Sequence, residues 1–248
     1  MARKETKIQT FKKHIAEISK GAELIPGVYN YCDRWCERCT MAKHCSIYYM
    51  EQQEIKNGEE NKNSVDRISD IFSLTMEMMQ DMSSELGIDF DEIGDFTIPE
   101  HTPSKLEELA IKYGKDVMLW LSANNKFFND YSENIMLVNE EASFKIGDCL
   151  ETISWYSSVI GAKIHRSMSQ LDTDYGDNIS DIEDQKGSAK VALISIDKSM
   201  ESFIYILNNI GEQEDDSLNF LAALSKIRRN ILKLFPDALD FIRPGFDE

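Results

Sequence analysis

Four of the five cysteines of this chain lie in one short segment, at Cys32, Cys36, Cys39 and Cys45, with the spacing C-x3-C-x2-C-x5-C. Thiolate groups gathered in this way are ligands for zinc or for an iron–sulfur cluster. On one regular helix Cys32 and Cys39 would stand about 10.5 Å apart along the axis. The sulfur ligands of a tetrahedral zinc ion lie only roughly 4 Å apart, so the backbone must turn tightly around a bound metal.

The grouping of the cysteines bears on which metal they hold. Zinc sites usually combine two short pairs of ligands separated by a longer loop, whereas four ligands in one run are typical of a 4Fe–4S cluster. The spacing therefore favours the cluster, with structural zinc as the alternative and cysteines without metal as a third interpretation. His44, next to Cys45, could replace one thiolate as a ligand.

The first three cysteines also share the C-x3-C-x2-C spacing of radical S-adenosylmethionine enzymes. That resemblance implies an α/β barrel whose strands hold the cofactor. The rest of the chain has a helical pattern without βα units, so we do not expect radical chemistry.

A second group of polar residues lies on the apolar faces of two neighbouring helices, expected over residues 141–171 and 188–209. Its members would line a small polar pocket between these helices: Tyr156, Lys163, Arg166, Lys190 and Asp197. A buried carboxylate is costly without a partner, so we expect Asp197 to have a cationic or hydrogen-bonding partner. The candidates are Lys163, Arg166 and Lys190. The pocket of an enzyme is one interpretation. Structural ion pairs that complete no catalytic set are the other.

Three blocks of the sequence resemble a set of uncharacterised bacterial helical proteins. They are YCDRWCERC at 31–39, the pair WY at 155–156 with Lys163 and Arg166, and GSAKVAL at 187–193. The resemblance implies that the cysteine segment and the charged helix pair belong to one architecture. It implies no substrate.

The acidic stretch between these two helices resembles a calcium loop of the EF-hand type. Asp172, Asp174 and Glu183 occupy the first, third and twelfth positions of such a loop. Gly176, however, comes one position too early, and Asp177 stands where the turn needs glycine. Calcium binding at 172–183 is therefore an alternative to a plain solvated loop.

The elements that must position these groups are helices. Proline is scarce, and apolar residues recur every three or four positions, which is the helical period. The pattern predicts long helices over residues 6–20, 64–86, 104–125, 141–171, 188–209 and 217–235. Ser104 and Glu107 fit a capping box, and Ser188 is an expected helix cap. We therefore predict an all-α fold, a helical bundle or an orthogonal array of about five to six long helices.

The cysteine segment and the helix before it are expected to form an appendage of residues 1–60 on a bundle of residues 61–248. The formal net charge of -17 disfavours nucleic acids and anionic membranes as partners. The charged N-terminus has no apolar run of the kind an export signal requires, and no stretch is apolar enough to span a membrane. We expect a cytoplasmic location, where cysteines are more often metal ligands than disulfides.

These observations lead to two functional hypotheses. The first is a metal-binding helical protein, holding an iron–sulfur cluster or zinc, that serves in redox sensing or protein interaction. The second is an enzyme that binds a small ligand in the polar pocket, with the metal in a structural or electron-transferring role. The sequence names no partner, whether protein or small molecule.

Overall fold

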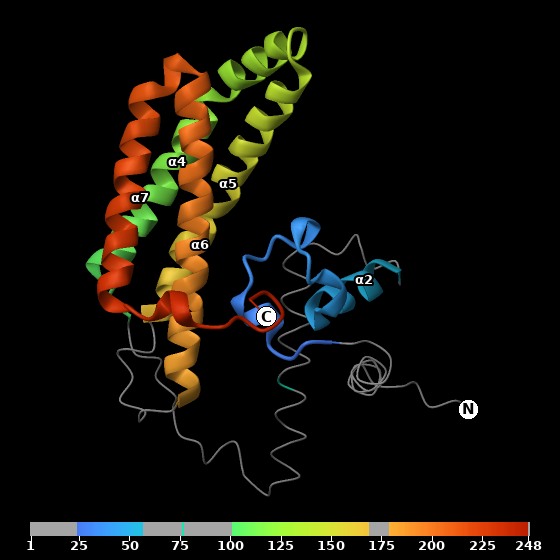
Figure 1. Cartoon of the computed structure of the whole chain (residues 1–248), viewed down its shortest axis with the longest axis vertical. Helices are drawn as coiled ribbons and strands as arrows, with labels where there is room; N and C mark the ends of the chain where they lie inside the picture. The colour runs from blue at the N-terminus through green and yellow to red at the C-terminus, as the bar shows by residue number, and fades with distance from the viewer. Residues whose placement is uncertain (1–23, 57–75, 77–100, 169–178, 248) are drawn as a thin grey trace, which may run out of the picture. The chain divides into compact units, whose positions relative to one another are not determined.

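The computed structural model describes residues 24–56, 76, 101–168 and 179–247 (Figure 1). Within these residues the regular structure is helical and no strand is present, which confirms the predicted all-α fold. The α-helices are α2 (Ser46–Lys56), α4 (Lys105–Met136), α5 (Glu140–Met168), α6 (Ile179–Asn209) and α7 (Glu214–Leu234). The short 3-10 helices are η1 (Val28–Tyr31), η2 (Cys36–Arg38), η3 (Ala42–His44), η6 (Gly211–Gln213) and η7 (Ala238–Asp240).

The chain divides into two compact units. One unit comprises residues 1–29 and 36–100, and the other comprises residues 30–35 and 101–248. The predicted boundary near residue 60 lies outside the described residues and stays a prediction. The helix expected over 6–20 lies outside them as well, and so does the helix expected over 64–86 apart from residue 76.

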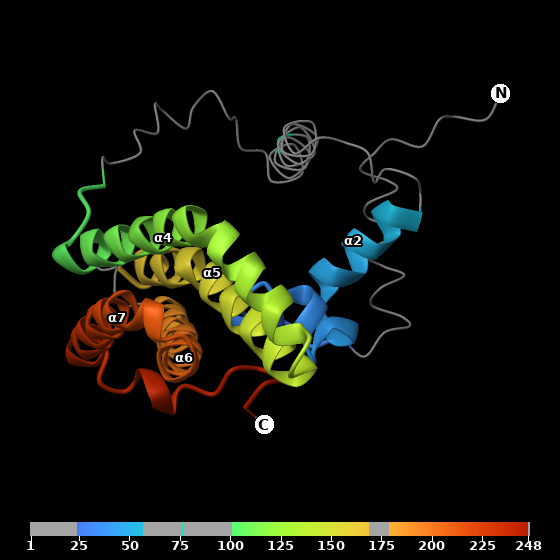
Figure 2. The same ribbon diagram turned by 90° about the horizontal axis from the view of Figure 1, so that it is seen from above.

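The four long helices of the second unit form an antiparallel bundle. Helix α4 packs on α5, α5 on α6, α6 on α7 and α7 on α4, so the four close into a ring, as Figure 2 shows from above. Residues 137–139 join α4 to α5, and residues 210–213 join α6 to α7. Connections this short reverse the chain direction, which is why consecutive helices run antiparallel.

The core of the bundle consists of the apolar faces that the helical periodicity predicted. Ile153, Ile160 and Phe203 are fully buried, as is the ring of Tyr156. Trp120 lies among aromatic rings, and its Nε1 donates a hydrogen bond of 2.8 Å to Oε1 of Gln213. The indole N–H is therefore satisfied although it is buried.

Helix α4 begins as the capping-box motif predicted and ends later than expected. The Glu107 backbone N–H donates to Oγ of Ser104 at 3.3 Å, and the Ser104 backbone N–H donates to Oε2 of Glu107 at 2.7 Å. The helix continues past the expected end at Asn125 to Met136. It does so because Phe128, buried against Trp120, extends the apolar face by further turns.

Helix α6 begins earlier than predicted, so the expected cap at Ser188 was wrong. Gly187 and Ser188 lie inside the helix, which begins at Ile179, and both are buried. A Cβ atom on Gly187 would lie 2.3 Å from Cε1 of Tyr31 and 2.9 Å from Cε1 of Phe241. The glycine thus permits a close approach of two aromatic rings to the helix and does not start it.

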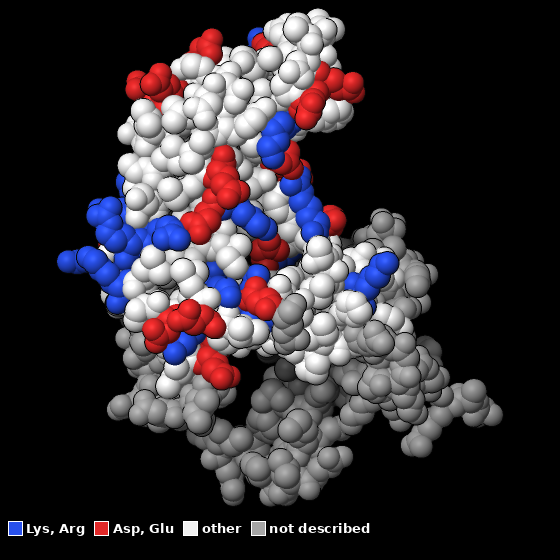
Figure 3. Space-filling model, in the orientation of Figure 1, with Lys and Arg blue, Asp and Glu red and all other residues white. Residues whose placement is uncertain are grey.

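Charged side chains of both signs lie next to one another on the second unit, residues 30–35 and 101–248. Figure 3 shows Lys and Arg side chains beside Asp and Glu side chains on the lower half of this unit, consistent with its ion pairs. No described helix combines the length and the apolar character that a membrane span needs.

Candidate functional site

Residues 30–35, which we call the anchored segment, are held on α5 by side-chain hydrogen bonds. Nζ of Lys163 donates to the backbone carbonyl oxygen of Asn30 at 3.0 Å, and Nη1 of Arg166 makes a longer contact of 3.4 Å with the same oxygen. Nε1 of Trp155 donates to the backbone carbonyl oxygen of Asp33 at 3.0 Å. Two carbonyl groups of this segment therefore have partners on one helix.

The Asp33 side chain is the second attachment of the anchored segment. The Tyr156 hydroxyl donates to Oδ2 of Asp33 at 2.6 Å and accepts a hydrogen bond of 2.9 Å from Nζ of Lys198 on α6. Lys198 also forms an ion pair with Asp33 at 3.6 Å. The Tyr156 hydroxyl therefore bridges the amino group of Lys198 on α6 and the carboxylate of Asp33 in the anchored segment.

Aromatic contacts complete the attachment. Trp35 is 6% exposed, stacks on Trp155 with ring centroids 5.2 Å apart, and meets Tyr156 edge-on at 5.9 Å. Between Asp33 and Trp35, Arg34 has a φ of 60°, in the left-handed region that non-glycine residues rarely adopt. The contacts on either side hold this unfavourable backbone conformation in place.

Lys163 is the buried cation beside Cys32. Its side chain is 8% exposed, and burial lowers the pKa of its amino group to about 8. The neighbouring Cys32 acts to raise that pKa, whereas Arg166 and Arg34 act to lower it. The prediction that the apolar face of α5 continues into a lysine is confirmed, and the amine faces the segment that carries the first cysteine.

The other residues of the predicted pocket have separate partners. Arg166 makes a bidentate ion pair with Asp184, with N···O distances of 2.6 and 2.9 Å. Lys190 pairs with Asp247 at 2.8 Å, near the end of the chain. Tyr156, Lys163 and Arg166 therefore turn toward the anchored segment, while Lys190 turns toward the C-terminal residues.

Asp197 differs from its prediction in both burial and partner. Its side chain is 47% exposed, and its carboxylate accepts hydrogen bonds of 2.8 and 3.3 Å from Arg228 on α7. A cationic partner was expected, but the candidates Lys163, Arg166 and Lys190 were wrong. Periodicity along one helix could not show that an arginine of α7 faces this position.

The cysteines that follow the anchored segment lie in tight successive turns. The backbone N–H of Cys39 donates to the carbonyl of Cys36 at 3.2 Å, and that of Cys45 donates to the carbonyl of Ala42 at 3.2 Å. Cys45 is buried, and Cys36 and Cys39 are partly buried. The segment is therefore not one regular helix. A metal shared by the cysteines would require such a departure from a regular helix. Cys32 belongs to the other unit, and the four-cysteine metal site stays a prediction.

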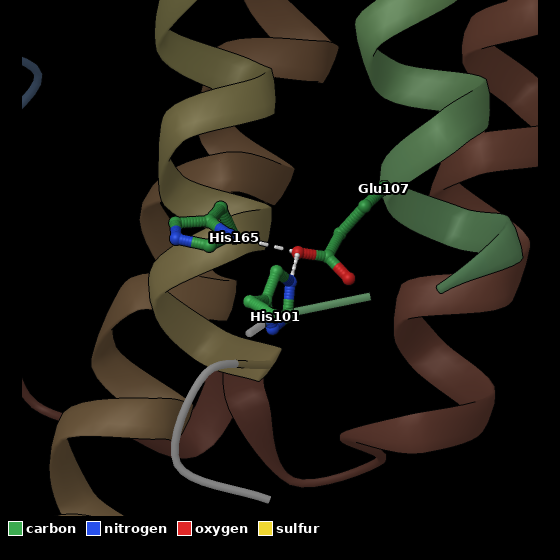
Figure 4. A group of neighbouring side chains, drawn as sticks. All are labelled: His101, Glu107 and His165. Atoms are coloured by element: carbon green, nitrogen blue, oxygen red, sulfur yellow. Dashed lines mark hydrogen bonds and ion pairs between the residues drawn. The ribbon is translucent and has the colours of Figure 1, made fainter. Parts of the chain in front are cut away.

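A third group, which sequence reasoning missed, consists of His101, Glu107 and His165. Figure 4 shows both imidazole rings directed at one carboxylate oxygen. Nε2 of His101 and Nδ1 of His165 each lie 2.8 Å from Oε1 of Glu107, and Glu107 is 3% exposed. Burial acts to raise the pKa of Glu107, but hydrogen bonds from Ser104, His165 and His101 outweigh it and lower the pKa to about 2.

The sequence contained only weak signals for this group. Glu151 lies fourteen residues before His165 on the same helix, but Glu151 is exposed and the carboxylate that faces His165 is that of Glu107. Glu107 was recognised for its capping role alone. Its second role depends on α5 crossing the start of α4.

Comparisons with known proteins identify no relative of this chain. No protein-family model matches the chain, and no curated protein or solved structure matches it. The residues of this chain that could carry a function are the cysteine segment with its anchors and the group around Glu107.

Proposed function

We propose that this chain is a metal-binding helical protein in which Cys32, Cys36, Cys39 and Cys45 hold an iron–sulfur cluster or a zinc ion. The observation that carries the proposal is the attachment of residues 30–35, with the first cysteine, to α5 and α6. The protein would serve in redox sensing or protein interaction. A cytoplasmic location, where thiols stay reduced, suits this role.

The cost of holding the anchored segment supports a functional purpose. Ordering the backbone costs about 1–2 kcal/mol per residue, and a left-handed residue such as Arg34 adds roughly 1–2 kcal/mol. Backbone held under strain by its surroundings tends to occur at functional sites. Fixing Cys32 would lower the entropy lost when the ligands gather around a metal, because part of the loop is already ordered.

The charge near Cys32 is also suited to metal-bound thiolates. Four thiolates around zinc or a 4Fe–4S cluster carry a net negative charge. The buried amine of Lys163, protonated below its pKa of about 8, would offset part of that charge from beside the first ligand. The tight turns at Cys36–Cys39 and Ala42–Cys45 suit a chain that wraps around one metal centre.

The alternative, an enzyme with a small-ligand pocket lined by all five predicted residues, is not favoured by their contacts. Lys163 and Tyr156 bind the anchored segment, Lys190 binds Asp247, and Asp197 binds Arg228. These residues have structural partners and do not converge on one point.

The proposal is tested by metal and acid-labile sulfide analysis, with a visible absorption spectrum, on the full chain purified without oxygen. Cys36→Ser is the test variant, and Cys149→Ala, which removes the buried cysteine of α5, is the matched control. We expect iron with sulfide and a broad visible band, or zinc without colour, in the wild type and the control. Cys36→Ser should lose the iron and sulfide, or should hold about one zinc ion per chain fewer than the control. A wild-type chain without either metal would refute the proposal.

A further inference from the structure

We propose that His101, Glu107 and His165 form a second metal site, which takes one divalent transition-metal ion such as Zn²⁺. This site uses none of the four cysteines and is independent of the function proposed above. Its residues come from the segment before α4, from the first turn of α4 and from the last turns of α5. Two of the four histidines of the chain therefore meet at one buried carboxylate.

The spacing of the ligand atoms is close to that of a metal site. Nε2 of His101 and Nδ1 of His165 each lie 2.8 Å from Oε1 of Glu107, and the three ligand atoms lie within 4.8 Å of one another. Around a tetrahedral zinc ion with bonds of about 2.0–2.1 Å, nitrogen and oxygen ligands are roughly 3.3 Å apart. Small side-chain rotations would therefore admit the ion.

The carboxylate is already oriented for this role. Oε2 of Glu107 accepts the backbone N–H of Ser104 at 2.7 Å, and this bond belongs to the capping box that starts α4. It leaves Oε1 directed at the two imidazoles. Hydrogen bonds of this kind orient metal ligands and strengthen binding in known sites.

The types of the ligands indicate the class of metal. Two imidazole nitrogens and one carboxylate oxygen suit zinc, copper, nickel or cobalt, whereas calcium and magnesium prefer oxygen ligands alone. The His101 and His165 side chains are 30% and 57% exposed, so solvent reaches the group. A bound ion would keep a coordination position open to water or to an external anion, as zinc does with three protein ligands.

A purely structural role is the competing explanation. Both nitrogens that face Glu107 could carry protons and donate hydrogen bonds, which would fasten the start of α4 to α5. A metal would displace these two protons and bind the same nitrogens. The two explanations thus differ in whether the histidines respond to metal.

The test is equilibrium dialysis of the full-length protein against Zn²⁺, with bound metal counted by mass spectrometry. His101→Gln and His165→Gln keep a side chain that can still hydrogen-bond to Glu107. Glu151→Gln is the matched control, because Glu151 is an exposed carboxylate on the same helix as His165. We expect each histidine variant to bind about one Zn²⁺ per chain fewer than the wild type and the control. Cys36→Ser should retain this ion, which separates the site from the cysteine segment.

Nuclear magnetic resonance of ¹⁵N-labelled histidine provides a measurement on the wild type, so that a misfolded variant does not decide the outcome. Zn²⁺ should shift the Nε2 resonance of His101 and the Nδ1 resonance of His165 when about one equivalent is added beyond the metal that the cysteines hold. Equal zinc content in folded histidine variants, or wild-type resonances that do not respond to Zn²⁺, would overturn the proposal.

Discussion

The indole Nε1 of Trp155 donates a hydrogen bond of 3.0 Å to the backbone carbonyl oxygen of Asp33, across 122 positions of sequence. The same indole stacks on Trp35, two residues after Asp33. Trp155 therefore makes both a polar and an apolar contact with the anchored segment. The segment that carries Cys32 is part of the packing of the bundle, and changes in the bundle should reach it.

Gly187→Ala should destabilise the protein by about 1–3 kcal/mol, the usual effect of overpacking. The added Cβ would lie 2.3 Å from Cε1 of Tyr31 and would push that ring, with the anchored segment, away from α6. Gly147→Ala on α5 is the control, since a Cβ there meets nothing within 4 Å and should stabilise the helix by up to about 1 kcal/mol. Urea unfolding followed by circular dichroism measures both. Equal effects of the two substitutions would contradict the packing described at Gly187.

Tyr156→Phe should lower the free energy of unfolding by about 1.5–3 kcal/mol, because its hydroxyl donates to the charged carboxylate of Asp33. Tyr131→Phe removes a hydroxyl whose partner is the backbone carbonyl of Asn209, a neutral and exposed contact, and should cost only about 0.5–1.5 kcal/mol. Urea unfolding compares the two variants. We also expect Tyr156→Phe to release the metal proposed at the four cysteines faster to a chelator, because Cys32 would be held less firmly. Release at the wild-type rate would separate the anchor from the metal site.

The free energy of unfolding at acidic pH should depend on whether the Asp247 carboxyl group is ionised. Hydrogen bonds from Arg243, and after them from Lys190, hold the pKa of Asp247 well below its usual range, although burial opposes them. A carboxyl group whose pKa is lowered by folding stabilises the protein above its unfolded pKa, which is about 3.9, and this contribution is lost as the pH falls below that value. Asp247→Asn should therefore be less stable at pH 6 and flatter in its acid dependence. Asp240→Asn, at an exposed carboxylate with the same change in charge, is the control.

Asp197 and Lys163 should contribute independently to the free energy of unfolding. Their partners are Arg228 and the Asn30 carbonyl, so a double-mutant cycle of Asp197→Asn with Lys163→Met should give a coupling energy below about 0.5 kcal/mol. The cycle of Asp197→Asn with Arg228→Met should give up to about 1 kcal/mol and should weaken in high salt, as for exposed ion pairs. Strong coupling between Asp197 and Lys163 would instead indicate the shared pocket that the sequence suggested.

The features that the sequence alone determined are local. Helical periodicity predicted the all-α fold and the continuation of the buried face of α5 into Lys163, which is 8% exposed. The motif of Ser104 and Glu107 predicted the start of α4, because a capping box involves residues only three positions apart. The cysteine spacing predicted tight turns, since thiolates that share a metal cannot lie along one helix.

The features that only the tertiary structure decided are the long-range partners. Glu107 meets His165 across 58 positions, and Lys163 meets the carbonyl of Asn30 across 133. Gly187, inside α6, lies against the ring of Tyr31 from the anchored segment. Periodicity specifies which face of a helix is buried but not which other element covers it. Partners of buried and charged groups follow from helix packing, which no local pattern records.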